Sequence, residues 1–183
     1  MNYPENKYFQ YIPTSPQPIG LWKLKDSIAN LDINYWINQC YKISETYPSE
    51  RKSNVRGYQS PDSLHKHPNF INLVSLLRNS IFLLTQNSNY TLAGLWVNIS
   101  FPGSYNGPHN HGTDPEQTSG VLYLKTPPDC GHIGFINPYN PNRLTEFHPT
   151  KGDLLLFPSP LDHLVTPNYS EEDRISIAFN CQH

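Results

Sequence analysis

The stretch GPHNHGTDPEQTSGVLYLK, residues 107–125, places a Gly-Pro turn and two histidines directly before an apolar strand. His109 and His111 are separated by one residue. Because alternate residues of a strand face the same side, both imidazoles can point into one end of a β-barrel or sandwich. Imidazole nitrogens are ligands for Fe, Zn, Ni and Cu. The stretch therefore predicts a β-rich fold with a candidate metal site beside one of its strands.

The rest of the second half of the chain also has the pattern of strands. From Leu92 onward, short runs rich in β-branched, Leu or aromatic residues are separated by Gly, Pro or Asn; they are LAGLWVNIS, SGVLYLK, GHIGFIN, NRLTEFH, GDLLLFPS and RISIAFN. Such a series of short, punctuated apolar runs is typical of a sandwich or barrel.

Two helices are expected before these strands. The first extends from about Ile33 to Tyr47, with Asp32 as its N-cap. The second follows Pro68, which suits a first helical turn. Its apolar stripe consists of Phe70, Ile71, Val74, Leu77, Ile81 and Leu84. Two helices followed by six or more strands predict an α+β, mainly β, domain.

The chain shows no linker or internal repeat, so residues 1–183 are expected to form a single domain. Within it, residues 1–91 would supply an N-terminal arm and supporting helices, and residues 92–183 the β core with the metal site. Residues 1–20 are rich in Pro and Tyr and predict an extended arm or a first edge strand. Residues 48–64 are polar and predict a loop.

Charge and composition exclude several classes of partner. The formal net charge is −2 and the sequence pI about 6.4, which gives no basic footprint for nucleic acid and no polybasic membrane anchor. Without a signal-peptide pattern or a membrane-length apolar run, we expect a soluble cytoplasmic protein with no membrane partner. The three cysteines, Cys40, Cys130 and Cys181, are odd in number and far apart, which favours buried free thiols in a reducing compartment.

A third histidine follows about fifty residues after the first two. In KGDLLLFPSPLDHLVTPN, residues 151–168, an apolar strand and a Pro-Ser-Pro turn precede His163. One strand pair could bring His163 opposite His109 and His111, and three protein ligands with open positions are typical of a catalytic metal. The pair His65 and His67 in LHKHP has the same spacing but no partner motif, so we expect ordinary loop histidines there.

The last strand offers a candidate site for a carboxylate. In RISIAFN, residues 174–180, strand alternation places Arg174, Ser176 and Ala178 on one face and the Ile-Ile-Phe residues on the other. An Arg with a Ser two residues further on can bind a carboxylate through charge-assisted hydrogen bonds. The alternative is a surface Arg paired with one of the acidic residues at 171–173.

Taken in order, these motifs resemble the Fe(II)/2-oxoglutarate-dependent dioxygenases, and most of all a prolyl-hydroxylase-like group of 2OG-Fe(II) oxygenases. The motifs that carry the likeness are WVN (96–98), PHNH (108–111), SGVLYL (119–124), GHIGF (131–135), FPSPLDHLVTPN (157–168) and RISIAFN (174–180). The resemblance implies a double-stranded β-helix, or jelly roll, braced by the N-terminal helices.

The resemblance also implies the chemistry. Fe(II) would be held by His109, His111 and His163, and 2-oxoglutarate would chelate it, leaving a position for O2. Arg174, Ser176 and the hydroxyl of Tyr123 would bind the far carboxylate of 2-oxoglutarate. The enzyme would hydroxylate a protein side chain or a small metabolite and release succinate and CO2.

Position 111 departs from the family pattern, in which the first motif is His-x-Asp/Glu. If His111 takes the place of that carboxylate, three neutral imidazoles leave the ferrous site two charges more positive than the metal-free site, and the 2-oxoglutarate dianion would neutralise it. Alternatively, Asp114 supplies the carboxylate beside His111, and His109 becomes a supporting partner.

Two other functions compete with this interpretation. A cupin-type three-histidine metalloenzyme would not use 2-oxoglutarate, and GSYNGPHNHGTDPE, residues 103–116, fits the start of a cupin signature. Such an enzyme has no need for Arg174 and Ser176, which makes these two residues the discriminator. A non-catalytic jelly-roll binding module would retain no metal, because the fold alone does not imply function.

Overall fold

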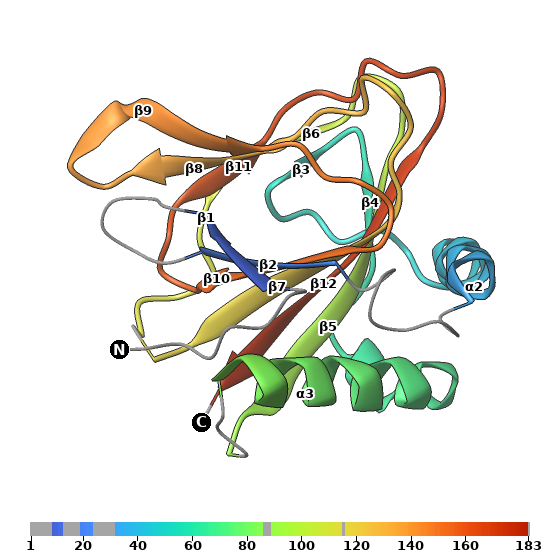
Figure 1. Cartoon of the computed structure of the whole chain (residues 1–183). Coiled ribbons are helices and arrows are strands. Elements are labelled where there is room, and N and C mark those ends of the chain that lie inside the picture. Colours follow the sequence, from blue (N-terminus) through green and yellow to red (C-terminus); the bar gives the residue numbers. More distant parts are fainter. Residues whose placement is uncertain (1–8, 13–18, 24–31, 86–88, 115, 183) are drawn as a thin grey trace.

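The computed structural model describes residues 9–12, 19–23, 32–85, 89–114 and 116–182. These residues form two facing antiparallel sheets with helices on one outer side (Figure 1). The larger sheet has seven strands in the order β1-β2-β10-β7-β12-β5-β4. Their bounds are Phe9–Ile12 (β1), Ile19–Lys23 (β2), Asp153–Pro158 (β10), Thr118–Lys125 (β7), Arg174–Gln182 (β12), Thr91–Ser100 (β5) and Tyr58–Gln59 (β4).

The smaller sheet has five strands in the order β3-β6-β11-β8-β9. Their bounds are Asn54–Val55 (β3), Tyr105–His109 (β6), His163–Val165 (β11), Ile133–Asn137 (β8) and Asn140–Phe147 (β9). Neighbours in both sheets are often far apart in sequence, as β12 is from β5 and β11 from β6. Two antiparallel sheets with such crossovers form the expected jelly roll, and the mainly β fold class is confirmed.

Two helices cover the outer face of the larger sheet. Helix α2 spans Ile33–Thr46, and the carboxylate of Asp32 caps it by accepting the backbone N–H of Tyr35 at 3.0 Å. Helix α3 spans Ile71–Thr85 and follows two short 3-10 turns, Leu64–Lys66 (η1) and Pro68–Phe70 (η2). Both predicted helices are confirmed within a few residues.

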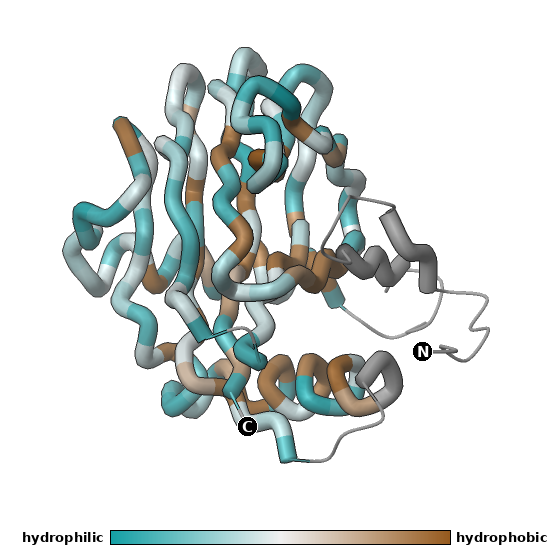
Figure 2. Tube along the Cα trace, turned by 90° about the vertical axis from the view of Figure 1, so that its left-hand side faces the viewer, coloured by the Kyte–Doolittle hydropathy of each residue, from teal (hydrophilic) through white to brown (hydrophobic). Residues whose placement is uncertain are grey.

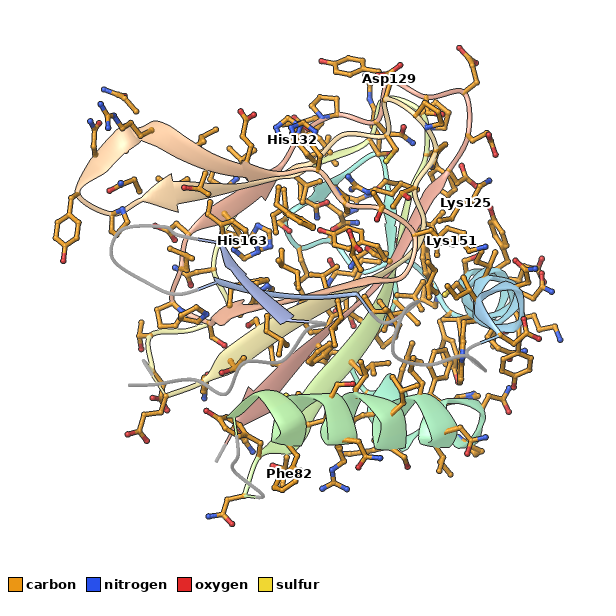
Figure 3. The ribbon with its side chains drawn as sticks, in the orientation of Figure 1. Phe82, Lys125, Asp129, His132, Lys151 and His163 are labelled. Carbon is orange, nitrogen blue, oxygen red and sulfur yellow. The ribbon has the colours of Figure 1, made fainter. Side chains whose placement is uncertain are left out.

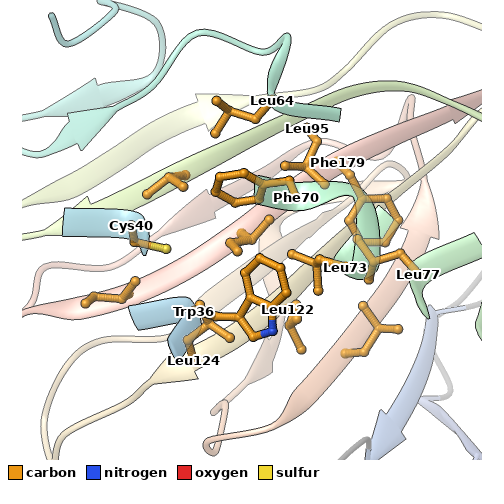
Figure 4. Close-up of a cluster of buried hydrophobic side chains, with 14 of the residues drawn as sticks. Trp36, Cys40, Leu64, Phe70, Leu73, Leu77, Leu95, Leu122, Leu124 and Phe179 are labelled. Carbon is orange, nitrogen blue, oxygen red and sulfur yellow. The ribbon is translucent and has the colours of Figure 1, made fainter. Parts of the chain in front are cut away.

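The main hydrophobic core lies between these helices and the sheet (Figure 4). Trp36 and Cys40 of α2 and Leu73 and Leu77 of α3 pack there against apolar residues of β5, β7, β10 and β12. The predicted stripe of α3 was wrong at Ile71, the first residue of the helix, which is 56% exposed. The side chain of Leu84, the last residue of that stripe, lies outside the described part of the structure. All three cysteines are buried free thiols, as expected.

A second, smaller core lies between the two sheets. Its buried members are Tyr123, Ile133, Phe135, Leu155, Phe157 and Leu161. Strand alternation divides the larger sheet between the two cores: on β12, Ile175 and Ile177 face the helices, while Arg174 and Ser176 face the smaller sheet. In Figure 2 brown and teal segments alternate along the strands, as expected where the two faces differ in their surroundings.

Several short strands outside the six predicted apolar runs extend both sheets. β1 forms one edge of the larger sheet, as expected for an N-terminal edge strand, and β2 joins it to β10. β3 and β4 lie in the segment 48–64, which was predicted to be a loop; that prediction was incomplete, because each is only two residues long and is defined by pairing with a distant strand. Among the described residues, no helix has the length and apolar character needed to cross a membrane.

Candidate active site

The structure brings His109, His111 and His163 together between the two sheets. His109 ends β6, and His163 begins β11 directly opposite it in the strand register. The ring centroids are 4.3 Å apart for His109 and His163, 5.1 Å for His111 and His163, and 5.2 Å for His109 and His111. One nitrogen from each ring lies within 4.8 Å of the others, so the three could hold one metal ion.

Backbone carbonyls orient two of the three rings. His109 Nδ1 donates to the carbonyl of Gly107 at 2.8 Å, and His163 Nδ1 donates to the carbonyl of Leu161 at the same distance. A carbonyl can only accept, so the proton of each neutral imidazole resides on Nδ1. Nε2 then carries the free lone pair that a metal requires, which is the usual arrangement of metal-binding histidines.

Burial keeps these imidazoles neutral. Loss of solvent lowers the pKa of His109, lowers the pKa of His111 to about 4 and lowers the pKa of His163 to about 3, and the neighbouring histidines add to the shift for the last two. Aromatic rings surround part of the cluster. The ring of Phe157 packs edge-on against that of His163, with centroids 4.9 Å apart, and the centroids of Trp96 and His111 are 5.4 Å apart. All three are therefore available as neutral ligands at physiological pH.

Asp114 lies outside this cluster of ligand atoms. Its side chain is exposed, and its Oδ1 accepts the backbone N–H of Glu116 at 2.9 Å. The second histidine pair has local roles in the loop before α3. His67 Nδ1 accepts the backbone N–H of Asn69 at 3.2 Å, and His65 Nδ1 lies 3.3 Å from the carbonyl of Asp62.

Arg174 is a buried cation in the same cavity, only 4% exposed. Its Nη1 donates to the carbonyl of Cys130 at 3.1 Å and its Nη2 to Oγ of Ser100 at 2.8 Å. Nε has no hydrogen-bond partner, and none of the ion pairs within the described residues involves this guanidinium. Burial lowers the pKa of Arg174, which shows the cost of a charge without a counter-ion.

The predicted helpers of Arg174 lie beside it on neighbouring strands. Ser176 of β12 pairs with Tyr123 of β7 on one side and with Asn98 of β5 on the other, and all three side chains line the cavity. Burial raises the pKa of the Tyr123 phenol, so it remains a neutral hydroxyl. Ser176, Tyr123 and Asn98 form a row across three neighbouring strands. This row supplies hydroxyl and amide groups beside Arg174, and such a set of donors suits a carboxylate.

One cavity of about 290 Å³ connects the histidine cluster to this row. The lining also includes polar residues: exposed or half-exposed Glu50, Lys52, Asp62 and Asn106, which we take as the mouth of the cavity, and buried Gln59. The segment 48–64, which contributes all of these residues except Asn106, was predicted only as a loop.

Sequence reasoning missed Trp96 and Asn98 as site residues, although the motif WVN that contains them had been noted. Alternation along β5 could have identified them, since both occupy the face opposite the helix-packed residues Leu95 and Val97. Asn180, which also lines the cavity, continues the same face of β12 past Ala178.

Comparison with known families supports this chemistry. Residues 137–180 match the model of a family described as "Putative 2OG-Fe(II) oxygenase". The matched segment includes His163, Arg174 and Ser176. No curated protein matches the sequence.

Solved structures with similar folds include several 2-oxoglutarate enzymes. A prolyl-4-hydroxylase of Pseudomonas putida has a TM-score of 0.66 at 14% identity, over 92% of this chain and 94% of its own. HygX of Streptomyces hygroscopicus, solved with nickel and 2-oxoglutarate, has a TM-score of 0.64 at 14% identity. The match covers 89% of this chain and 82% of the HygX chain.

A viral collagen prolyl hydroxylase of Paramecium Bursaria Chlorella virus-1, solved as a 2OG complex, covers 98% of both chains with a TM-score of 0.60 at 19% identity. At such low identity these structures establish the fold, and the family model adds the relationship in sequence. The chain thus has the fold of these structures, and its residues 137–180 match the model of a 2OG-Fe(II) oxygenase family.

Proposed function

We propose that this protein is an Fe(II)- and 2-oxoglutarate-dependent oxygenase that uses O2 to hydroxylate a protein side chain or a small metabolite. One observation carries the proposal: three neutral histidines and a buried arginine without an anionic partner line the same cavity. The first group fits a divalent metal and the second fits the far carboxylate of a bound dicarboxylate.

The histidine cluster fits a ferrous ion in charge and in donor type. His109, His111 and His163 would hold the ion through ring nitrogens, with His109 and His163 fixed in orientation by their carbonyl partners. The bound metal and cosubstrate would supply the oxidising chemistry that attacks an unreactive C–H bond, with release of succinate and CO2. Because the cluster contributes no negative charge, it favours a dianionic cosubstrate.

Arg174 would anchor the cosubstrate at the other end. Its Nη1 and Nη2 are held by Cys130 and Ser100, so the guanidinium is fixed before any ligand arrives. The unpartnered Nε and the hydroxyls of Ser176 and Tyr123 remain to bind a carboxylate. A cupin-type enzyme that acts without 2-oxoglutarate leaves this buried cation unexplained.

The primary substrate would enter past the polar mouth of the cavity. Glu50, Lys52 and Asp62 bring charges of both signs to this mouth, and Asn106 and Asn110 bring amides. Such a lining supports a polar substrate, whether a peptide segment with its backbone amides or a hydrophilic metabolite. Hydroxylation of a protein side chain is the activity named for the prolyl hydroxylases among the structural neighbours.

Conversion of 2-oxoglutarate to succinate tests the proposal. The purified protein is incubated in air with Fe(II) and 2-oxoglutarate, and succinate is measured by mass spectrometry. We expect slow turnover that requires Fe(II), rises when peptide or metabolite fractions contain the substrate, and disappears in His163→Ala. His65→Ala serves as the matched control, because it removes a partly exposed histidine outside the cavity. Succinate at the level of a chelator-treated sample, with and without those fractions, would refute the assignment.

A further inference from the structure

A second group of metal-type ligands lies on the outer side of the smaller sheet. It consists of His132, directly before β8, together with Glu146 and His148 at the end of β9. Ile133 pairs with Phe147, so the register places His132 across from His148, and Glu146 shares the face of His148 by strand alternation. Figure 3 shows His132 on the outer side of this sheet, whereas His163 lies between the sheets.

The three side chains converge closely. His132 Nε2 lies 3.6 Å from Glu146 Oε1, and His148 Nε2 lies 3.8 Å from Glu146 Oε2. The two imidazole rings are 4.3 Å apart at their centroids. These nitrogen–oxygen distances exceed those of a hydrogen bond. They are close to the separation of about 3.4 Å between two ligands of a tetrahedral cation with bonds of about 2.0–2.1 Å.

The surroundings of His132 indicate which nitrogen is free. Its Nδ1 lies 3.3 Å from the hydroxyl of Thr166, which also accepts the backbone N–H of His132 at 2.8 Å. Its Nε2 is buried and has no hydrogen-bond partner. With the ring proton on Nδ1, Nε2 directs a lone pair toward the carboxylate of Glu146, and a cation bound between the two groups would relieve this repulsion.

We propose that His132, Glu146 and His148 bind a divalent transition-metal cation of the zinc type, separate from the site in the cavity. Two imidazoles and one carboxylate are a donor set that Zn2+ accepts, and a single carboxylate leaves one positive charge uncompensated. His132 and His148 also line a groove with Asp129, Thr166 and Tyr169. A fourth ligand, water or a donor in this groove, would complete the coordination.

A cation bound by these three residues would connect the end of β9 to the segment 130–132, which precedes β8. The carbonyl of Cys130 in this segment accepts the N–H of Arg174. A ligand that binds the native state only also raises the stability of that state. The site thus predicts metal-dependent stabilisation that does not require the histidines of the cavity.

Stoichiometry of Zn2+ binding tests the proposal. Chelator-treated protein is titrated with Zn2+ against a chromophoric competitor, in a His163→Ala background that removes a ligand of the first cluster. We expect one equivalent to remain. Glu146→Gln and His148→Ala should each weaken its binding at least tenfold, because each removes one of three ligands. Both side chains are at least half exposed, so the fold should persist, with circular dichroism as the check.

His65→Ala in the same background is the matched control and should retain the full equivalent. The proposal is overturned if the His163→Ala protein binds no Zn2+ more tightly than about 1 mM, or if Glu146→Gln and His148→Ala leave the binding unchanged. The Zn2+ titration requires no 2-oxoglutarate. It therefore tests the second site independently of the proposed oxygenase activity.

Discussion

Position 111 is the residue at which this chain departs from the usual His-x-Asp/Glu pattern, and the structure places its imidazole within the cluster. If His111 is the third ligand, His111→Ala should lower the affinity for Fe(II) by about 10- to 100-fold. Asp114→Asn should leave the affinity unchanged, because that carboxylate is exposed and accepts a backbone N–H instead. Anaerobic Fe(II) titration of both variants measures the difference. Loss of affinity in Asp114→Asn alone would transfer the role to Asp114.

Arg174 is the residue that distinguishes a 2-oxoglutarate enzyme from other metal-binding jelly rolls. Arg174→Lys keeps a positive charge but loses the planar fork that Cys130 and Ser100 hold in place. Loss of a charge-assisted pair costs about 1.5–3 kcal/mol, so the Kd for 2-oxoglutarate should rise about 10- to 100-fold. Isothermal titration of the metal-loaded protein measures it.

Arg143→Lys provides the control for Arg174→Lys, since Arg143 is an exposed residue of β9. It should bind 2-oxoglutarate as the unmodified protein does. Equal affinity in Arg174→Lys and Arg143→Lys would mean that the cosubstrate carboxylate binds elsewhere.

At the scale of elements, the close packing of β7 against β12 depends on a residue without a side chain. A Cβ at Gly120 would lie 2.3 Å from a ring carbon of Phe179 and 2.7 Å from a methyl of Leu156, both in the main core. Overpacking of this kind costs about 1–3 kcal/mol. Gly120→Ala should therefore lower the free energy of unfolding by that amount, measured by urea denaturation.

Gly94→Ala in β5 is the matched control for Gly120→Ala. The nearest atoms to a Cβ at Gly94 are 3.7 Å away, which is ordinary contact, so stability should change by less than about 0.5 kcal/mol. Equal destabilisation by both substitutions would indicate a general cost of replacing strand glycines and not this particular packing.

The elements also show what sequence patterns can and cannot reveal. β5, β7, β10 and β12 were predictable because each contains enough alternating or apolar residues to bury one face. β6 and β11, which present His109 and His163, were not predicted as strands. They are short, and their identity depends on pairing with one another across more than fifty residues. Strand alternation alone predicted that Arg174 lies on the face of β12 opposite the face that packs in the main core.

The second histidine group escaped sequence reasoning for a similar reason. His132 and His148 are sixteen positions apart, and only the register of β8 with β9 places them together. The mouth of the cavity was equally hidden, because Glu50 and Lys52 lie in a polar segment without periodicity. Composition and spacing thus identified the histidines in the cavity, while long-range pairing determined what surrounds them.

At the scale of the whole molecule, the buried histidines make the stability of the metal-free protein depend on pH. An unfolded histidine binds a proton near pH 6.5, whereas the folded pKa is about 4 for His111 and about 3 for His163. Between the folded pKa values and pH 6.5, the unfolded state therefore binds more protons than the folded state. The free energy of unfolding falls as the pH is lowered from 7 toward the folded pKa values. At pH 5 each histidine would cost about 1–2 kcal/mol.

Thermal melting of metal-free protein between pH 7.5 and 5 measures this dependence. The melting temperature should fall by several degrees, and the fall should be smaller in His163→Ala than in the control His65→Ala, which removes a partly exposed histidine. A melting temperature with the same pH dependence in all three proteins would show that these imidazoles are not held neutral by the fold.

The histidine cluster and Arg174 are proposed to bind Fe(II) and 2-oxoglutarate together in one cavity. Anaerobic titration of 2-oxoglutarate into Fe(II)-loaded protein, followed through the visible metal-to-ligand charge-transfer band, measures this joint binding. We expect a saturable band in the unmodified protein, a band that needs higher 2-oxoglutarate in Arg174→Ala, and no band in His163→Ala. Iron binding with no band at saturating 2-oxoglutarate would contradict this proposal and favour a metalloenzyme that does not use this cosubstrate.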